Sequence, residues 1–193
     1  MYALVESGTI TKYFNNPKGF MLGDVQYSSD IFMKWSVEEK TAIGIHEVVF
    51  DDSNKKDEKW YINTNQSFTF ADGTATASYG SATAQAHADV TETIDGVEST
   101  TPGLKTNLIK DLKTTVANIL AKTDWYITRN TEKSTAIPSA ISTHRDAVRT
   151  KQASIEAQIT GAADTASLET LHTYTTTDGV TSRPLGELPV LES

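Results

Sequence analysis

The chain has 193 residues, with 25 acidic and 17 basic side chains, and its formal net charge of −8 argues against a nucleic-acid-binding protein. No apolar stretch approaches the roughly 20 residues that a membrane helix needs, so we expect no membrane role. The N-terminal residues lack the basic and long apolar regions of a signal peptide, and none is expected. The absence of cysteine excludes disulfides, thiol catalysis and zinc–cysteine sites, and it fits a protein made in a reducing cytosol.

The composition favours a modular protein over one with a single large core. Hydrophobic residues make up 38% of the chain, and threonine alone contributes 29 residues. Threonine favours strands and loops over helices. Low apolar content together with abundant threonine therefore predicts several small cores.

Residues 1–80 are predicted to form a β-rich N-terminal domain with one short helix. A first hairpin is expected at the Ser7–Gly8 turn, and the alternating stretch before Asp72–Gly73 is typical of another. Ser36 and Glu39 have the spacing of a capping box, in which hydroxyl and carboxylate satisfy backbone donors reciprocally at the start of the helix. Further strands are predicted at Val25–Tyr27, Ile45–Phe50 and Trp60–Ile62.

Residues 81–103 are predicted to be a linker that is helical in part, because an alanine-rich start precedes two glycines and a proline. Residues 104–174 are predicted to form a helical module. Apolar side chains recur every three or four residues from Leu104 to Ala121, which predicts one amphipathic helix. A second helix is expected from Pro138 to about residue 160, since proline suits a first helical turn. Small side chains along this helix would let a neighbour approach closely: Ala140, Ala147, Ala153 and Ala157.

Asp164 is expected to cap a third short helix, and residues 175–193 are expected to form an extended tail. Asp178–Gly179 is typical of a turn, and two prolines keep the chain extended around Leu185. The predicted fold class is α+β. It comprises the β-rich domain, the linker, a C-terminal helical hairpin with a third short helix, and the tail.

No catalytic or metal site is predicted. The histidines lack the spacing of a helical metal site, and they are His46, His87, His144 and His172. Neighbouring carboxylates such as Glu38–Glu39 lie in a cap or a charged loop, so we expect a solvated surface rather than an acid–base pair across a cleft. The sequence contains no phosphate-binding loop, nucleophile elbow or dinucleotide motif. We therefore expect neither enzyme activity nor a cofactor.

A short stretch joins the two long predicted helices and carries Asp124 and Trp125. In a structural interpretation, Asp124 caps the following turn and Trp125 fills the gap between the helices. Arg129, Arg145 and Arg149 would then cover the indole or pair with Asp124. In a functional interpretation, tryptophan and arginine anchor a partner protein, because both are enriched at interface hot spots. We favour the structural role for Trp125 and regard Arg149 as the better interface candidate.

The same residues carry a resemblance. Thr123–Arg129, then Ile137–Pro138, then Arg145 and Arg149 form a pattern of Thr-Asp-Trp, Ile-Pro and paired arginines on a helix. This pattern resembles the tail-assembly chaperones and tail-fibre-assembly proteins of bacteriophages, with His144 at the usual tyrosine position. The N-terminal part is similar to the β-rich heads of the same phage proteins at Met1–Val5, Gly8, Tyr27, Trp35–Ser36, Glu39, Ala42–Ile45, Glu47–Val48 and Phe70–Gly73.

The resemblance implies a phage tail or tail-fibre assembly protein that binds the fibre polypeptide and assists its folding or attachment, and some such proteins stay on the virion. The implied partners are a phage tail-fibre or baseplate protein, with self-association as a further option. The implied location is the host cytoplasm during assembly, or the virion tail if the protein is retained. The expected structural motif comprises Asp124, Trp125, Arg129 and Pro138.

The expected partner-binding residues are Arg145, Arg149, Arg183 and Leu185. The segment from Arg183 to Leu191 is expected to add a strand to the edge of a partner's sheet. Two alternatives stay open. One is a purely structural component of the virion tail or fibre, and the other is a carbohydrate-binding receptor module that uses exposed Trp35, Trp60 and Tyr61.

Overall fold

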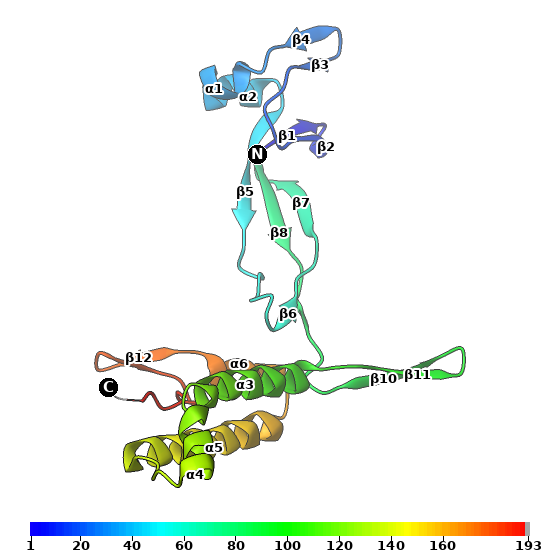
Figure 1. The fold of residues 1–193 in the computed structure, drawn as a ribbon. Coiled ribbons are helices and arrows are strands. Elements are labelled where there is room, and N and C mark those ends of the chain that lie inside the picture. The colour runs from blue at the N-terminus through cyan, green and yellow to red at the C-terminus, as the bar shows by residue number, and fades with distance from the viewer. Residues whose placement is uncertain (192–193) are drawn as a thin grey trace. The chain divides into compact units, whose positions relative to one another are not determined.

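The computed structural model describes residues 1–191, and the chain divides into two compact units. Unit 1 is Met1–Thr83 and unit 2 is Ala84–Ser193. Helices and strands both occur, so the predicted α+β class is confirmed (Figure 1). Within the described residues, no helix is both long enough and apolar enough to cross a membrane.

Unit 1 is built mainly from a curled sheet with the strand order β2-β1-β5-β8-β7. The pair β5–β8 is parallel, and β1–β2, β1–β5 and β7–β8 are antiparallel. A separate hairpin, β3–β4, and two short helices complete the unit. The elements are β1 (Tyr2–Glu6), β2 (Thr9–Phe14), β3 (Phe20–Leu22), β4 (Val25–Tyr27), α1 (Ile31–Lys34), α2 (Val37–Ala42), β5 (Ile45–Asp51), β6 (Tyr61–Ile62), β7 (Gln66–Ala71) and β8 (Thr74–Tyr79), with β9 (Thr83–Ala84) at the unit boundary.

The core of unit 1 is divided into small clusters. In one cluster the rings of Phe14, Phe20 and Phe32 pack with centroids 4.8 to 6.0 Å apart, together with Leu4, Ile31 and Ile45. Another cluster consists of Ala3, Val48, Ala75 and Ala77. Alanine contributes little apolar area, so the second cluster buries less apolar surface than the phenylalanine cluster.

The predicted hairpin turns and the predicted capping box of unit 1 are confirmed. Hairpins form at Ser7–Gly8 and at Asp72–Gly73, and all four turn residues have positive φ. The capping box is present: Ser36 Oγ accepts from Glu39 N at 3.2 Å, and Ser36 N donates to Glu39 Oε2 at 2.8 Å. The prediction of one short helix is wrong, because α1 precedes the capped helix α2.

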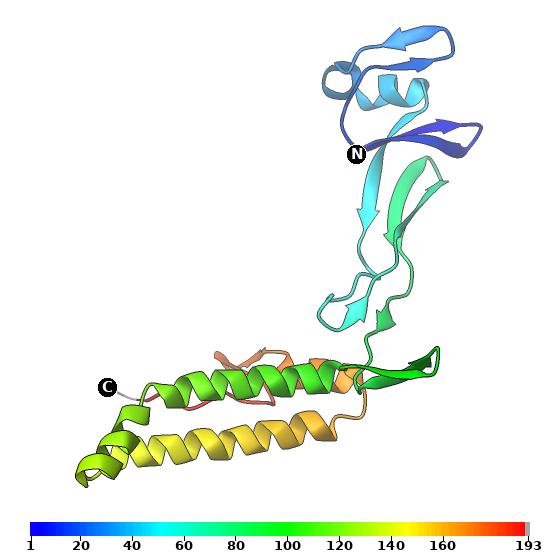
Figure 2. The ribbon, with the colours of Figure 1, turned by 45° about the vertical axis from the view of Figure 1, so that its right-hand side comes forward.

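Unit 2 is a helical layer that carries two hairpins. The helices α3 and α5 lie side by side and run in opposite directions in both ribbon views (Figures 1 and 2). Val116, Val148, Ile155, Ile159 and Leu168 are buried within the unit. The elements are β10 (Val90–Ile94), β11 (Val97–Thr101), α3 (Leu104–Ala121), α4 (Asp124–Lys133), α5 (Ser139–Gly161), α6 (Thr165–His172), β12 (Thr175–Thr177) and β13 (Val180–Ser182).

The helix predicted over residues 104–121 is confirmed at both ends, and the second predicted helix is confirmed to within a residue. Asp164 caps α6 as expected, because its Oδ1 accepts from Ser167 N at 2.7 Å. Pro138 stands at the N-cap of α5, where its carbonyl accepts from Ile141 N and Ser142 N.

The prediction of a partly helical linker is wrong. No residue of 81–103 is helical, and residues 90–101 form the hairpin β10–β11. Its turn residues, Asp95 and Gly96, have φ values of 51° and 79°, which is the Asp-Gly hairpin geometry. The alanine-rich start stays extended because Ala86 O and His87 O accept hydrogen bonds from Leu104 N and Lys105 N at the start of α3.

The prediction of an extended tail is also wrong in part. Thr175–Thr177 and Val180–Ser182 pair as a hairpin around Asp178–Gly179. Beyond it, Leu185 is 4% exposed and its N–H donates to Leu171 O at 3.1 Å. At Leu185 the chain after the hairpin therefore packs against the rest of unit 2. Residues 192–193 of the predicted tail lie outside the described residues.

Asp89 caps α3 from outside the helix. The N-cap of α3 is Gly103, which has no side chain, and Asp89 Oδ1 accepts from Gly103 N at 2.8 Å and from Thr106 Oγ1 at 2.6 Å. These bonds, first the hydroxyl and then the backbone N–H, lower the pKa of Asp89. The base of the β10–β11 hairpin is thereby tied to the start of the helix.

The lowered pKa predicts an acid dependence of stability. The contribution of Asp89 is fully present above the unfolded pKa of about 4, and it is lost as the pH falls through the lower folded pKa. Asp89→Asn is expected to lower stability at neutral pH and to flatten the acid limb of a plot of unfolding free energy against pH. Urea unfolding at a series of pH values, from neutral to below the unfolded pKa of Asp89, measures both effects. Asp111→Asn, on the exposed surface of α3, is the control, and equal acid limbs in the two variants would contradict the prediction.

Candidate functional site

The predicted motif residues meet where α3 ends and α4 begins, against α5. Arg145 projects from α5 and is 6% exposed. Its Nη1 donates to Leu120 O and to Thr123 Oγ1, both at 2.7 Å, and its Nη2 lies 2.9 Å from Asp124 Oδ1. One guanidinium therefore connects the last turn of α3, the link and the first turn of α4.

The chemistry of helix ends explains this arrangement. The last carbonyls of a helix have no partner within it, and the C-terminus carries partial negative charge, so a cation is stabilised beside Leu120 O. The first turn of α4 favours an anion, which Asp124 supplies. Thr123 Oγ1 also donates to Leu120 O at 3.0 Å. The Nη1 and Nη2 atoms of the buried cation therefore face oxygen acceptors, whereas its Nε has no hydrogen-bond partner among the described residues.

The burial of Arg145 corrects its predicted role. A side chain that is 6% exposed and bonded to three groups of its own chain is not available to a partner. The pairing of an arginine with Asp124, which the structural interpretation predicted, is confirmed for Arg145. Arg149, one turn later, is exposed and pairs with Asp146 at 3.2 Å. Arg149 therefore stays an interface candidate.

Trp125 does not fill the gap between the two long helices, so its predicted structural role is wrong. The stretch that carries it is the helix α4, and Trp125 is 51% exposed. The Arg129 guanidinium lies 4.7 Å from the Trp125 ring centroid and 5.4 Å from that of Tyr126, and the two rings are 3.8 Å apart. The predicted covering of the indole is confirmed for Arg129. We call Trp125, Tyr126 and Arg129 the aromatic stack.

The tail residues do not form a free strand. Leu185 is buried, so its predicted role in partner binding is wrong. Arg183 Nε lies 2.8 Å from Glu187 Oε1, and its guanidinium lies 5.0 Å from the Tyr174 ring centroid. The final described residues line a shallow hollow against the alanine side of α5, with Pro189, Val190 and Leu191 beside Ala140 and Ala147. The tail thus lies beside Ala140 and Ala147, whereas Ala153 and Ala157, the other two alanines of the prediction, are exposed.

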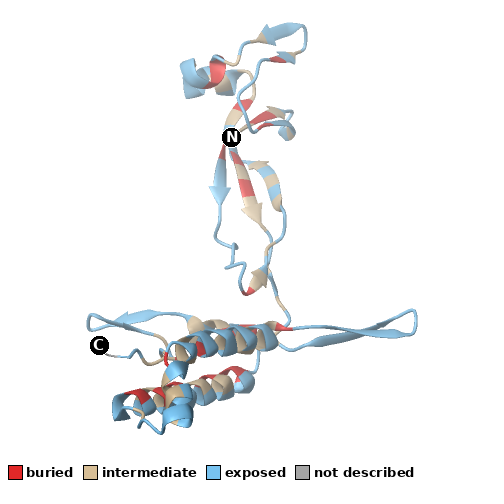
Figure 3. Cartoon of the chain, in the orientation of Figure 1, coloured by how far each residue is buried: buried red, intermediate tan, exposed pale blue. Residues whose placement is uncertain are grey.

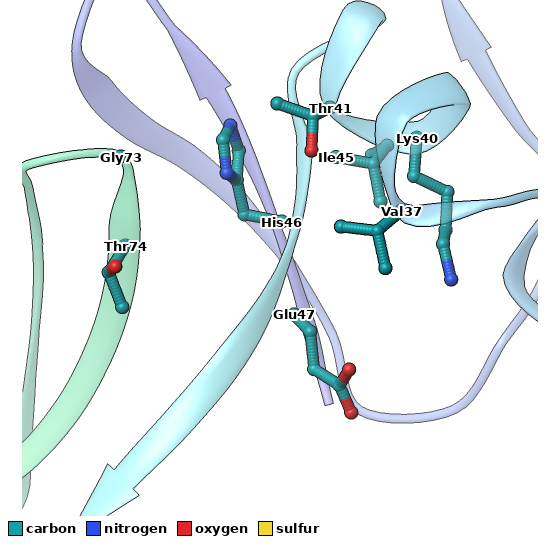
Figure 4. A pocket seen from close by; sticks show the side chains of 8 residues that line it. All are labelled: Val37, Lys40, Thr41, Ile45, His46, Glu47, Gly73 and Thr74. Atoms are coloured by element: carbon teal, nitrogen blue, oxygen red, sulfur yellow. The ribbon is translucent and has the colours of Figure 1, made fainter.

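Unit 1 contains a pocket of about 170 Å³ lined by residues of α2, β5 and the start of β8 (Figure 4). His46 lies on its wall, with its ring edge-on to Phe70 at a centroid distance of 4.6 Å. In Figure 4 the side chains of His46, Lys40 and Glu47 point to different sides, so they do not converge as an acid–base pair would. Among residues 1–191, no group of three or more His, Asp or Glu side chains could hold a metal.

The aromatic platform of the carbohydrate alternative is not present as predicted. Trp60 is 3% exposed, and Trp35 packs against the phenylalanine cluster of unit 1. Stacking on a sugar would need open rings on one face of the sheet. The burial of Trp60 removes one residue of the predicted platform, whereas Trp35 and Tyr61 are partly buried.

Comparisons of the chain with protein-family models, with curated proteins and with solved structures found no match. The site is therefore interpreted from its own chemistry. The sequence placed Thr123 in the motif but did not indicate that its buried hydroxyl accepts a hydrogen bond from Arg145. Sequence reasoning also missed α4, although Asp124 at the start and Lys133 at the end follow the charge preference of helix termini.

Proposed function

We propose that this chain is a phage tail or tail-fibre assembly protein, which binds a fibre polypeptide in the host cytoplasm and assists its folding or attachment. The observation that carries the proposal is the half-exposed aromatic stack on α4. Its residues belong to the pattern from Thr123 to Arg129 that resembles the phage family. The role is that of a binding protein rather than an enzyme.

The stack has the properties of a binding anchor. Tryptophan and arginine dominate interface hot spots because they bury a large area and retain a polar contact. The guanidinium over the indole restrains both side chains before a partner arrives, which reduces the entropy lost on binding. Arg145 fixes α4 against α3, so the anchor stands on a rigid helix.

Trp125→Ala tests this proposal. We expect the affinity for the fibre polypeptide to fall roughly thirtyfold, which corresponds to about 2 kcal/mol. The fold should persist because Trp125 is 51% exposed. Co-expression with the fibre polypeptide of the same phage, followed by co-purification and measurement of the yield of folded fibre, gives the readout.

Met33→Ala is the matched control, since Met33 is an apolar side chain in unit 1 that is 78% exposed. Arg149→Glu tests the second interface candidate in the same assay. Equal co-purification and equal fibre yield with Trp125→Ala and Met33→Ala would contradict the proposal. Mass spectrometry of purified particles then separates a chaperone that leaves from a component that stays on the virion in fixed stoichiometry.

A further inference from the structure

The two hairpins of unit 2 share a sequence and a turn geometry. Residues 93–99 read Thr-Ile-Asp-Gly-Val-Glu-Ser and residues 176–182 read Thr-Thr-Asp-Gly-Val-Thr-Ser, so the Thr, Asp, Gly, Val and Ser positions coincide. The turn aspartates both have φ of 51°, and the turn glycines have φ of 79° and 78°. Each hairpin also has one pair of threonine hydroxyls bonded across its strands, at 2.8 Å and 2.9 Å.

The two hairpins differ in charge and in apolar surface. Where β10–β11 has Glu92, Ile94 and Glu98, the corresponding positions of β12–β13 hold Thr175, Thr177 and Thr181. The strands of the first hairpin are therefore acidic and carry an additional aliphatic side chain. The strands of the second hairpin, β12 and β13, contain no charged residue. The second hairpin provides a natural control for the chemistry of the first.

One face of β10–β11 carries three exposed aliphatic side chains, with Glu92, Ser99 and Thr101 on the same face. Residues paired across an antiparallel ladder share a face, which places Ile94 and Val97 together with Val90. These three side chains are 61%, 68% and 40% exposed. Glu98 lies on the opposite face, paired with Thr93. Figure 3 shows the whole hairpin as exposed.

Both outer edges of the hairpin are also open. Within residues 1–191, β10 and β11 form a sheet of two strands, and such a sheet is marginally stable alone in water. Open edges accept further strands, and proteins often block them with lysine or proline. Residues 90–101 contain neither. The base of the hairpin is fixed to α3 by Asp89, so the edge is held in place.

We propose that the edge of β11 binds an extended, basic strand of a partner protein. The segment from residue 84 to residue 101 contains no lysine or arginine, and its acidic residues are Asp89, Glu92, Asp95 and Glu98. A strand that alternates an aliphatic and a basic residue would place the aliphatic side chain beside Val97 and the basic one beside Glu98, on opposite faces. A second copy of this chain would instead bring acidic hairpins together. This surface is independent of the aromatic stack.

A soluble peptide of alternating valine and lysine is the probe, and a peptide of alternating valine and glutamate is its control. Fluorescence anisotropy with the full chain at low salt measures affinity. We expect the lysine peptide to bind about tenfold more tightly than the glutamate peptide, with binding that weakens as salt rises. Amide hydrogen exchange is expected to show added protection at residues 97–101.

Three variants make the test specific. Glu98→Thr is expected to weaken binding of the lysine peptide severalfold, and the combined change Glu92→Thr, Ile94→Thr and Glu98→Thr is expected to abolish it. The reciprocal change, Thr175→Glu, Thr177→Ile and Thr181→Glu, is expected to create a second site on β12–β13. Because all these positions are exposed, the fold is retained, which circular dichroism verifies.

Trp125→Ala should leave peptide binding unchanged, so this inference can fail or succeed separately from the proposed function. Equal binding of the two peptides, no binding at all, or full binding by the triple threonine variant would overturn it. Protection confined to residues outside 90–101 would do the same. Sedimentation that shows dimers of the free chain, lost in the triple threonine variant, would make a second copy the occupant and would also overturn it.

Discussion

Replacing Arg145 with methionine is expected to lower the free energy of unfolding of unit 2 by about 3 kcal/mol. Methionine keeps an unbranched stem but has no donors, so Leu120 O and Thr123 Oγ1 both lose the partner that now lies at 2.7 Å. Asp124 loses its counter-ion as well. The side chain of Asp124 is 59% exposed and can bind water, which keeps the cost below that of stranding a fully buried charge.

Urea unfolding followed by far-ultraviolet circular dichroism measures this change, because α3 and α5 supply most of the helical signal. Arg149→Met is the control at an exposed arginine one turn away, and its effect should stay within about 0.5 kcal/mol. Arg145→Lys should recover part of the loss, since one ammonium cannot reach all three acceptors with the same geometry. Equal effects of Arg145→Met and Arg149→Met would show that the buried contacts contribute little.

The sequence predicts elements well where a signal is local. The apolar stripe from Leu104 to Ala121 predicts α3 at its observed bounds, and Asp164 and Ser36 cap the helices expected of them. Side-chain orientation between distant elements is less predictable. Arg145 lies 25 residues from its acceptor Leu120, and nothing in the spacing tells which arginine turns inward. We expect a tryptophan in a core more often than an arginine, yet here Arg145 is buried and Trp125 is exposed at the surface.

The missed hairpin has a different cause. Asp95–Gly96 is the same turn signal as Asp72–Gly73, but the alanines before it favour a helix in isolation. Tertiary hydrogen bonds override that preference, because Ala86 O and His87 O cap the start of α3. The burial of Leu185 is equally non-local, since it depends on contact with Leu171 in α6. The turn itself was predictable, and its context was not.

Gly103 is expected to be the least replaceable glycine of unit 2. A Cβ built on it would lie 2.3 Å from both the carbonyl carbon and the oxygen of Ala88. Its φ of −80° suits any residue, so the requirement for glycine is steric rather than conformational. The clashing atoms are backbone, and neighbouring carbonyls of the same segment are bonded to Leu104 N and Lys105 N. They cannot rotate away as the end of a side chain could.

Gly103→Ala is therefore expected to lower the free energy of unfolding of unit 2 by about 3 kcal/mol, at the upper end of overpacking costs. Gly161→Ala is the matched control, because a Cβ there meets nothing within 4 Å and the residue ends a helix. That change should be neutral or should stabilise by up to about 1 kcal/mol. Urea unfolding of both variants gives the comparison, and similar midpoints would contradict the steric argument. Because the clash displaces the segment that presents β10–β11, Gly103→Ala should also weaken binding of the lysine peptide, whereas Gly161→Ala should not.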